Sequence, residues 1–166
     1  MAKSVTVVFE KLPENIGELR ALPQMEQQKP FEIAALTAAV MLRYDESPQD
    51  ATEMMNVLRG SKYMTPYDMQ LLRDRLSGKG YIARSYFAGA APENGYQPDI
   101  PYSVTVFDDP NSYVDENFIK LNLRSSGADS PRQVQLKQRG GKWFLSENYL
   151  MGDIKEPAPA AENTET

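Results

Sequence analysis

Side chains that could do acid–base or metal chemistry are few in this sequence, and their types narrow the chemistry at once. The chain has 166 residues, with no histidine and no cysteine. It lacks the commonest general base and cannot form a thiol nucleophile, a disulfide or a zinc–thiolate site. Catalysis would have to rest on carboxylates, lysine or tyrosine, so we expect recognition rather than a reaction, and no cofactor.

The densest group of carboxylates belongs to one short segment and consists of Asp108, Asp109, Asp115 and Glu116. Asn111 and Ser112 stand between them, and an oxygen-rich loop of this kind can hold calcium. The calcium-loop spacing D-x-[DN]-x-[DN]-G is absent. We predict a solvated turn here and no metal site. The sequence shows no separated pair of carboxylates of the kind that would indicate a glycosidase.

The segment 124–132 is the most distinctive loop, because small residues and Gly127 lie between Arg124 and Arg132. Such a loop can turn its backbone N–H groups inward as an anion-binding nest. The pattern of a Walker loop is missing. Turn chemistry explains the same residues more simply, since Asp129 and Ser130 can bond to the local backbone.

Alternating polar and apolar residues indicate strands after residue 100 and place a set of polar side chains on one face. These are Ser103, Thr105, Lys120, Asn122, Arg124, Gln133, Gln135 and Lys137. An exposed antiparallel face is ordinarily polar, so solvation alone explains it. The functional interpretation is a shallow site for an anionic molecule or an acidic partner. Its predicted binding residues are Lys120, Asn122, Arg124, Arg132, Gln133, Gln135 and Lys137.

The elements that must position this face begin with a short strand at 5–9 and a helical segment at 16–22. A polar linker at 24–29 precedes three clearer helices. The first, over 30–43, is apolar nearly all round and should form the buried centre of the core. The others begin at Ser47-Pro48 and Thr65-Pro66, each with an aspartate in its first turn, which is N-terminal helix punctuation.

Five strands are predicted after the helices, over 81–87, 102–107, 118–124, 132–138 and 142–146. An irregular loop fills 88–101, and Gly140-Gly141 forms a tight hairpin turn. Because the strands are apolar on one side only, the helices must cover a single face of the sheet. The prediction is one α+β domain over 1–155, with its helical part at 16–78, its sheet at 81–150 and a disordered acidic tail at 156–166.

The charge of the chain excludes one large class of partner. The formal net charge is −5, with 10 basic and 11 acidic residues in 1–80, 7 and 8 in 81–150, and 1 and 4 in 151–166. The body is therefore nearly neutral and offers no basic footprint for nucleic acid. No signal-peptide or transmembrane pattern is present, so we expect a cytoplasmic protein without a membrane partner. Self-association stays open.

Four motifs of the C-terminal half are specific in order and wording: YFAGAAPENGYQP at 86–98, PYSVTV at 101–106, FIKL at 118–121 and RSSGADSPR at 124–132. Lys142-Trp143-Phe144-Leu145, Leu150 and Asp153-Ile154 complete the pattern. The chain thereby resembles, over about residues 30–156, a bacterial domain of unknown function found in clostridial and related Firmicutes proteins. The resemblance implies a bacterial intracellular protein and carries no assigned site residues. Ser146-Glu147-Asn148 departs from the Trp-Glu-Gln expected there.

Two functional hypotheses follow. The first is a non-catalytic binding or scaffold module that recognises a protein partner or an anionic ligand through the polar sheet face or the 124–132 loop. The alternative is a small-ligand-binding protein or small enzyme whose site lies between the sheet and the 88–101 loop.

Overall fold

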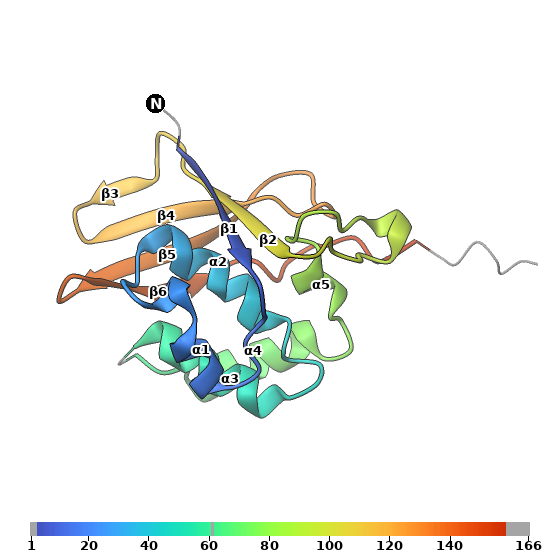
Figure 1. Ribbon diagram of the computed structural model, residues 1–166, viewed down its shortest axis with the longest axis horizontal. Coiled ribbons are helices and arrows are strands. Elements are labelled where there is room, and N and C mark those ends of the chain that lie inside the picture. Colours follow the sequence, from blue (N-terminus) through green and yellow to red (C-terminus); the bar gives the residue numbers. More distant parts are fainter. Residues whose placement is uncertain (1–2, 61, 159–166) are drawn as a thin grey trace, which may run out of the picture.

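The computed structural model describes residues 3–60 and 62–158 and has an antiparallel sheet with helices on one of its faces (Figure 1). The helices are α1 (Ile16–Ala21), α2 (Pro30–Met41), α3 (Pro48–Arg59), α4 (Pro66–Leu76) and α5 (Tyr81–Arg84), with 3-10 turns η1 (Pro23–Met25) and η2 (Pro92–Asn94). The strands are β1 (Ser4–Phe9), β2 (Tyr102–Phe107), β3 (Tyr113–Asp115), β4 (Phe118–Leu123), β5 (Arg132–Arg139) and β6 (Lys142–Asn148). The α+β class is confirmed.

The sheet runs in the order β1-β2-β4-β5-β6, and β3 pairs with β4 beside this path. Every pairing is antiparallel. The N-terminal strand β1 lies at one edge against β2, with Thr6 opposite Thr105. At the other edge, β6 is partly covered: Trp143 donates its backbone N–H to Gln28 O at 3.0 Å, and Arg59 donates Nη1–H to Ser146 O at 3.3 Å.

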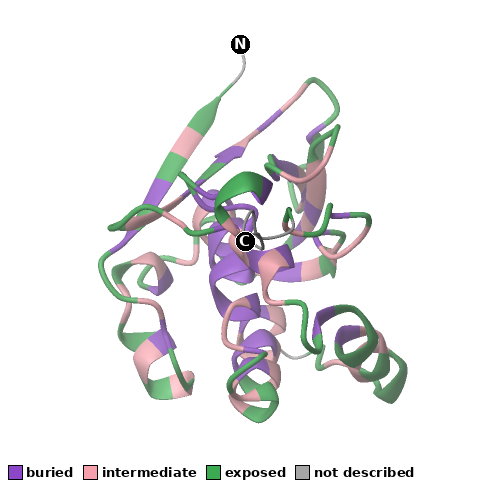
Figure 2. Cartoon of the chain, turned by 90° about the vertical axis from the view of Figure 1, so that its right-hand side faces the viewer, coloured by how far each residue is buried: buried purple, intermediate pink, exposed green. Residues whose placement is uncertain are grey.

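Helix α2 forms the centre of the core, as its apolar sequence predicts. Pro30 stands in its first turn, where a missing N–H costs nothing. All residues from Ile33 to Met41 are buried, and the one hydroxyl among them, Thr37, donates to Ile33 O at 3.0 Å. The helix packs against five strands of the sheet and against α3. Figure 2 shows the buried residues gathered in the middle of the molecule.

Helices α3 and α4 begin where the Ser-Pro and Thr-Pro pairs predict. Ser47 Oγ accepts from Asp50 N–H at 3.2 Å. Thr65 Oγ1 accepts from Asp68 N–H at 3.1 Å, and the Asp68 carboxylate accepts from Thr65 N–H at 3.0 Å, which completes a capping box. Both patterns are therefore N-terminal helix caps.

The strand predicted over 81–87 is wrong. Tyr81–Arg84 forms α5, and the chain then turns to Phe87. Ile82, Ala83, Tyr86 and Phe87 are all buried, which is helical rather than alternating spacing. In the described residues, four of the five predicted strands belong to the sheet, and β1 and the short β3 bring it to six.

The segment after β6 packs across the end of the molecule. Leu150 and Ile154 are buried, and Tyr86 donates its hydroxyl to Leu150 O at 2.5 Å. The hydroxyl of Tyr96, in the irregular loop, donates to Lys155 O at 2.6 Å. Residues 156–158 follow this path, and Ala158 N–H donates to Pro92 O at 2.9 Å. The rest of the predicted tail, 159–166, lies outside the described residues.

Among the described residues, no helix combines the length and the apolar character that crossing a membrane requires.

Candidate functional site

The side of the sheet that faces away from the helices is called the open face below. Register builds it from β4 and β5, where Lys120 lies opposite Gln135, Asn122 opposite Gln133, and Phe118 opposite Lys137. On β2, Ser103, Thr105 and Phe107 share this face. The structure therefore brings together six of the seven predicted binding residues: Lys120, Asn122, Arg124, Gln133, Gln135 and Lys137.

The cations of the open face lie over aromatic rings. Lys120 Nζ and Lys137 Nζ are each 5.9 Å from the centre of the Phe118 ring. The Arg124 guanidinium is 4.9 Å from the centre of the Phe107 ring. Both distances suit a cation–π interaction, which orients the charge without neutralising it. Within residues 3–60 and 62–158, none of the three cations has a carboxylate oxygen within ion-pair distance.

The amides of the open face are partly committed to each other and to their neighbours. Asn122 is buried, and its Nδ2 donates to Asp109 Oδ2 at 2.9 Å and to Phe107 O at 3.3 Å. Gln135 Nε2 donates to Gln133 Oε1 at 2.8 Å. Asn122 is therefore a structural residue, while the charge available for binding comes from Lys120, Arg124 and Lys137.

Two acids that the strand pattern did not place here border the open face. Asp109 contacts Asn122 from the turn after β2, and Glu147 lies opposite Gln135 across the β5–β6 pairing. A register irregularity at Gln135/Leu136 intervenes, so alternation along β6 alone does not predict the position of Glu147. The predicted positions of the face contain no acid, but these two acids lie beside them.

Arg132 is the predicted binding residue that lies elsewhere. It stands opposite Leu123, whose side chain is buried, and so alternates away from Gln133. Its guanidinium donates to Gly152 O at 3.0 Å, to Asp153 O at 3.1 Å and to Ser130 O at 3.0 Å. Arg132 therefore fastens the C-terminal segment to the sheet.

Three backbone N–H groups of the loop at 124–132 are bonded to acceptors of the protein itself. Ser126 N–H donates to Ser85 O at 3.0 Å, Gly127 N–H to Ser125 Oγ at 3.1 Å, and Ala128 N–H to Ser125 O at 3.3 Å. The buried Ser125 hydroxyl also donates to Ser85 Oγ at 2.7 Å. These bonds favour the turn interpretation over an anion nest. The partner, Ser85, is 40 residues away in sequence, so the loop pattern alone gives no sign of it.

A groove of about 670 Å³ lies beside the open face, between β2 and the segment 85–90. Thr105, Phe107 and Arg124 contribute from the sheet side. This is close to where the alternative hypothesis puts a small-ligand site, although the bordering wall is 85–90 rather than the whole 88–101 loop.

Asp108 also lines this groove. Its carboxylate accepts from Lys3 N–H at 2.7 Å and from the Tyr113 hydroxyl at 2.7 Å. These hydrogen bonds, the one from Lys3 first, lower the pKa of Asp108 below its usual value. Burial and the bond to Asp108 raise the pKa of Tyr113 to about 12. Asp108 is thus a fixed carboxylate that ties the backbone of Lys3 to β3.

Two of the remaining acids of the 108–116 segment accept backbone hydrogen bonds in turns. Asp109 Oδ1 accepts from Asn111 N–H and Asp115 Oδ1 from Asn117 N–H, both at 2.7 Å. The described part of the chain contains no group of three or more metal-ligating acidic side chains.

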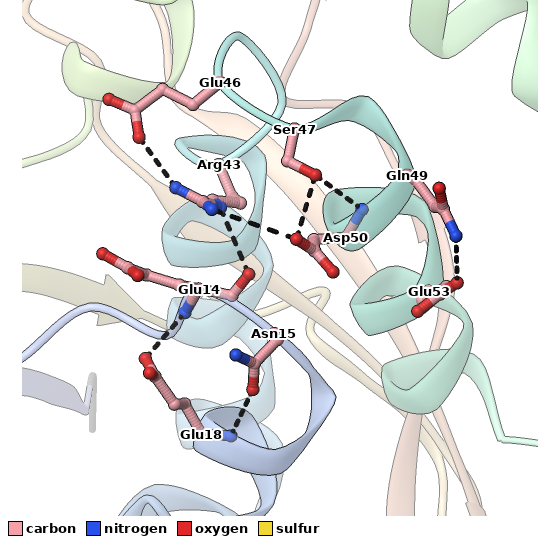
Figure 3. Close-up of polar contacts among 9 residues, drawn as sticks. All are labelled: Glu14, Asn15, Glu18, Arg43, Glu46, Ser47, Gln49, Asp50 and Glu53. Atoms are coloured by element: carbon pink, nitrogen blue, oxygen red, sulfur yellow. Dashed lines mark hydrogen bonds and ion pairs between the residues drawn. The ribbon is translucent and has the colours of Figure 1, made fainter.

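Unlike the cations of the open face, Arg43 is surrounded by acids and a carbonyl that it contacts (Figure 3). Its Nη1 donates to Glu46 Oε1 at 2.7 Å, its Nε to Glu14 O at 3.1 Å, and its Nη2 lies 3.9 Å from Asp50 Oδ2. It joins the turn before α1, the end of α2 and the start of α3. Because these contacts occupy it, Arg43 is a structural residue and not a binding candidate.

Comparison with known families gives one result. A family model described as "Domain of unknown function (DUF6935)" matches residues 11–158. No curated protein and no solved structure matches this chain.

Proposed function

Since the chain belongs to the family of unknown function DUF6935, whose match covers residues 11–158, its function must be argued from its own surface, and we propose that it is a non-catalytic binding module. Its open face binds an acidic segment of a protein partner or another anionic ligand. The setting is the bacterial cytoplasm, which a chain without cysteine fits.

One observation carries the proposal: Lys120, Arg124 and Lys137 project from the same sheet face over aromatic rings, without a carboxylate partner in the described residues. Arg43 shows that this chain supplies acids and carbonyls where a cation has a structural task. A set of aligned, unneutralised cations attracts anions and orders their approach.

The proposal is tested with a fluorescein-labelled hexaglutamate peptide, followed by anisotropy at low salt. The face variant is Lys120→Gln, Arg124→Gln and Lys137→Gln together. A matched control, Arg73→Gln, Arg75→Gln and Lys79→Gln, makes the same change in net charge on the exposed side of α4 and the turn after it.

We expect the face variant to bind the peptide at least roughly tenfold more weakly than the wild-type chain, because three favourable charges are lost. The control variant should stay within about twofold of wild type, and binding should weaken as salt is added. Equal losses in the two triple variants would reject the open face as the binding surface.

A second candidate function rests on the 670 Å³ groove, whose size suits a small ligand. Its lining includes the charged residues Lys3, Asp108 and Arg124, and Phe107 supplies an apolar wall. A thermal-shift screen of metabolites, nucleotides and sugars would identify such a ligand. A reproducible shift that Thr105→Trp abolishes, by filling the groove, would favour this function over recognition of an acidic segment.

A further inference from the structure

A second group of cations lies where β5 and β6 meet the end of α3. A pocket of about 150 Å³ opens there, and its charged and hydroxyl side chains are Arg59, Lys62, Lys137, Arg139, Ser146 and Glu147. Four positive side chains and one carboxylate therefore surround a volume of a few water molecules. The folded body is nearly neutral as a whole, so this corner is a local concentration of positive charge.

Arg59 lines the pocket with a side chain that several contacts hold in place. Its side chain is only 17% exposed and lies 3.8 Å from the Asp68 carboxylate. It donates Nε–H to Lys62 O at 2.8 Å and Nη1–H to Ser146 O at 3.3 Å. These contacts hold the backbone of Lys62 beside the edge of β6, and the Asp68 carboxylate partly neutralises Arg59.

Among the described residues, the charges of the other three cations are not balanced by an ion pair. Lys62, Lys137 and Arg139 are exposed, and none forms an ion pair in the part of the chain that the structure describes. The Arg139 guanidinium lies 4.8 Å from the centre of the Phe144 ring, and one of its Nη2–H groups donates to Arg59 O at 3.4 Å. This positions the guanidinium while leaving most of its donors unused.

An adjoining groove of about 630 Å³ shares the three cations, Ser146 and Glu147 with the pocket. It extends to Asp115, Asn117 and Phe118. A compact anion in the pocket could therefore carry a larger group along the groove. Glu147 offsets one of the three free cations of the pocket. A single carboxylate on a ligand would balance only one of the remaining two, whereas a phosphate group brings up to two charges and several acceptor oxygens.

We propose that this corner is a binding site for a phosphate dianion carried by a small molecule, with the phosphate in the pocket and the rest of the ligand over Phe118. The site goes beyond the proposed function: it requires Lys62 and Arg139, which the open face does not, and it shares Lys137, Phe118 and Gln135 with that face.

The test is a ¹H–¹⁵N NMR titration of the whole chain with sodium phosphate, at a pH where the dianion predominates, against sodium chloride at equal ionic strength. Phosphate should cause saturable shifts of the amides of Gly60, Lys62, Arg139 and Ser146, with an affinity on the millimolar scale. Phenyl phosphate should bind more tightly than phosphate because its ring contacts Phe118. Equal affinities would remove the groove from the proposal.

Charge variants make the test specific. Lys62→Gln and Arg139→Gln should each weaken phosphate binding by roughly threefold to tenfold. Glu147→Gln, which removes the carboxylate in the pocket, should strengthen it by about twofold or more. Lys120→Gln should bind phosphate as wild type does, so loss of the hexaglutamate site and loss of this site are distinguishable.

Shifts that chloride reproduces, or no saturation, would overturn the site. Wild-type affinity in Lys62→Gln and Arg139→Gln, or weaker binding in Glu147→Gln, would do the same. The amide spectrum reports whether each variant is folded, and the exposed Glu147 provides a variant that leaves the packing intact.

Discussion

The cations of this chain differ in what they contact. Arg43 and Arg132 each bond to carbonyls of other segments, whereas Arg124 and Lys137 lie over rings with their charge unneutralised. Sequence alternation predicted the correct face for Lys137 and its neighbours. Alternation puts Arg132 on the other side of the strand, and its place among the predicted binding residues rests on its position at the end of the 124–132 loop. The loop pattern gives no sign of its structural role, because the Gly152 and Asp153 carbonyls that it contacts lie about 20 residues further along the chain.

At the same scale, Asp108 makes stability depend on pH. Its pKa is lowered in the folded chain, so as pH falls the unfolded chain takes up the proton first. The stability that Asp108 contributes is therefore present near neutral pH. It is lost as pH falls from about 4 through the lower folded pKa.

We expect Asp108→Asn to lower the free energy of unfolding by about 1–3 kcal/mol near neutral pH, because the bonds to Lys3 and Tyr113 lose their charge. The difference from wild type should shrink in acid. Urea unfolding at about pH 7 and about pH 3 measures both values. Asp153→Asn, at an exposed carboxylate, is the control. A constant difference for Asp108→Asn would contradict the assignment.

At the scale of elements, the capping residues at the helix N-termini are the most informative part of the sequence. The starts of α3 and α4 follow from Ser47-Pro48 and Thr65-Pro66, because a cap and its first turn are close in sequence. Tyr81–Arg84 was misassigned because four residues hold too little of a helical period to distinguish it from alternation.

The capping box of α4 gives a prediction of its own. Thr65→Ala removes the acceptor of Asp68 N–H and should lower the free energy of unfolding by about 1 kcal/mol. Thr65→Ser keeps the hydroxyl and should stay within about 0.5 kcal/mol of wild type. Chemical denaturation compares the two, and equal destabilisation would show that the methyl group rather than the cap matters.

At the scale of the whole molecule, the α+β class and the coverage of one sheet face could be predicted, because one-sided strands require a single helical layer. The edge position of β1 could not, because nothing near Ser4–Phe9 indicates that β2 is its partner. The groove beside 85–90 could not be predicted from the sequence either. The C-terminal segment and serines that are far apart in sequence position its walls.

The C-terminal segment links the parts of the fold, and Leu150 is its fully buried side chain. Leu150→Ala should lower the free energy of unfolding by about 2–5 kcal/mol through the cavity it leaves. Met151 is only partly buried, so Met151→Ala should cost clearly less. Thermal and urea unfolding of both variants measure the difference. A loss for Leu150→Ala no larger than for Met151→Ala would mean that the segment is not part of the core.

The edge pairing of β1 also bears on the order in which the fold assembles. Thr6 and Thr105, whose hydroxyls meet across β1 and β2, are 99 residues apart in the chain. Closing a loop of that length costs about 4 kcal/mol of chain entropy, whereas β5 and β6 need only the turn at Gly140 and Gly141. Local hairpins and helices form faster than such distant contacts. We therefore expect β1 to be the last strand to join the sheet, although it is the first strand to be synthesised.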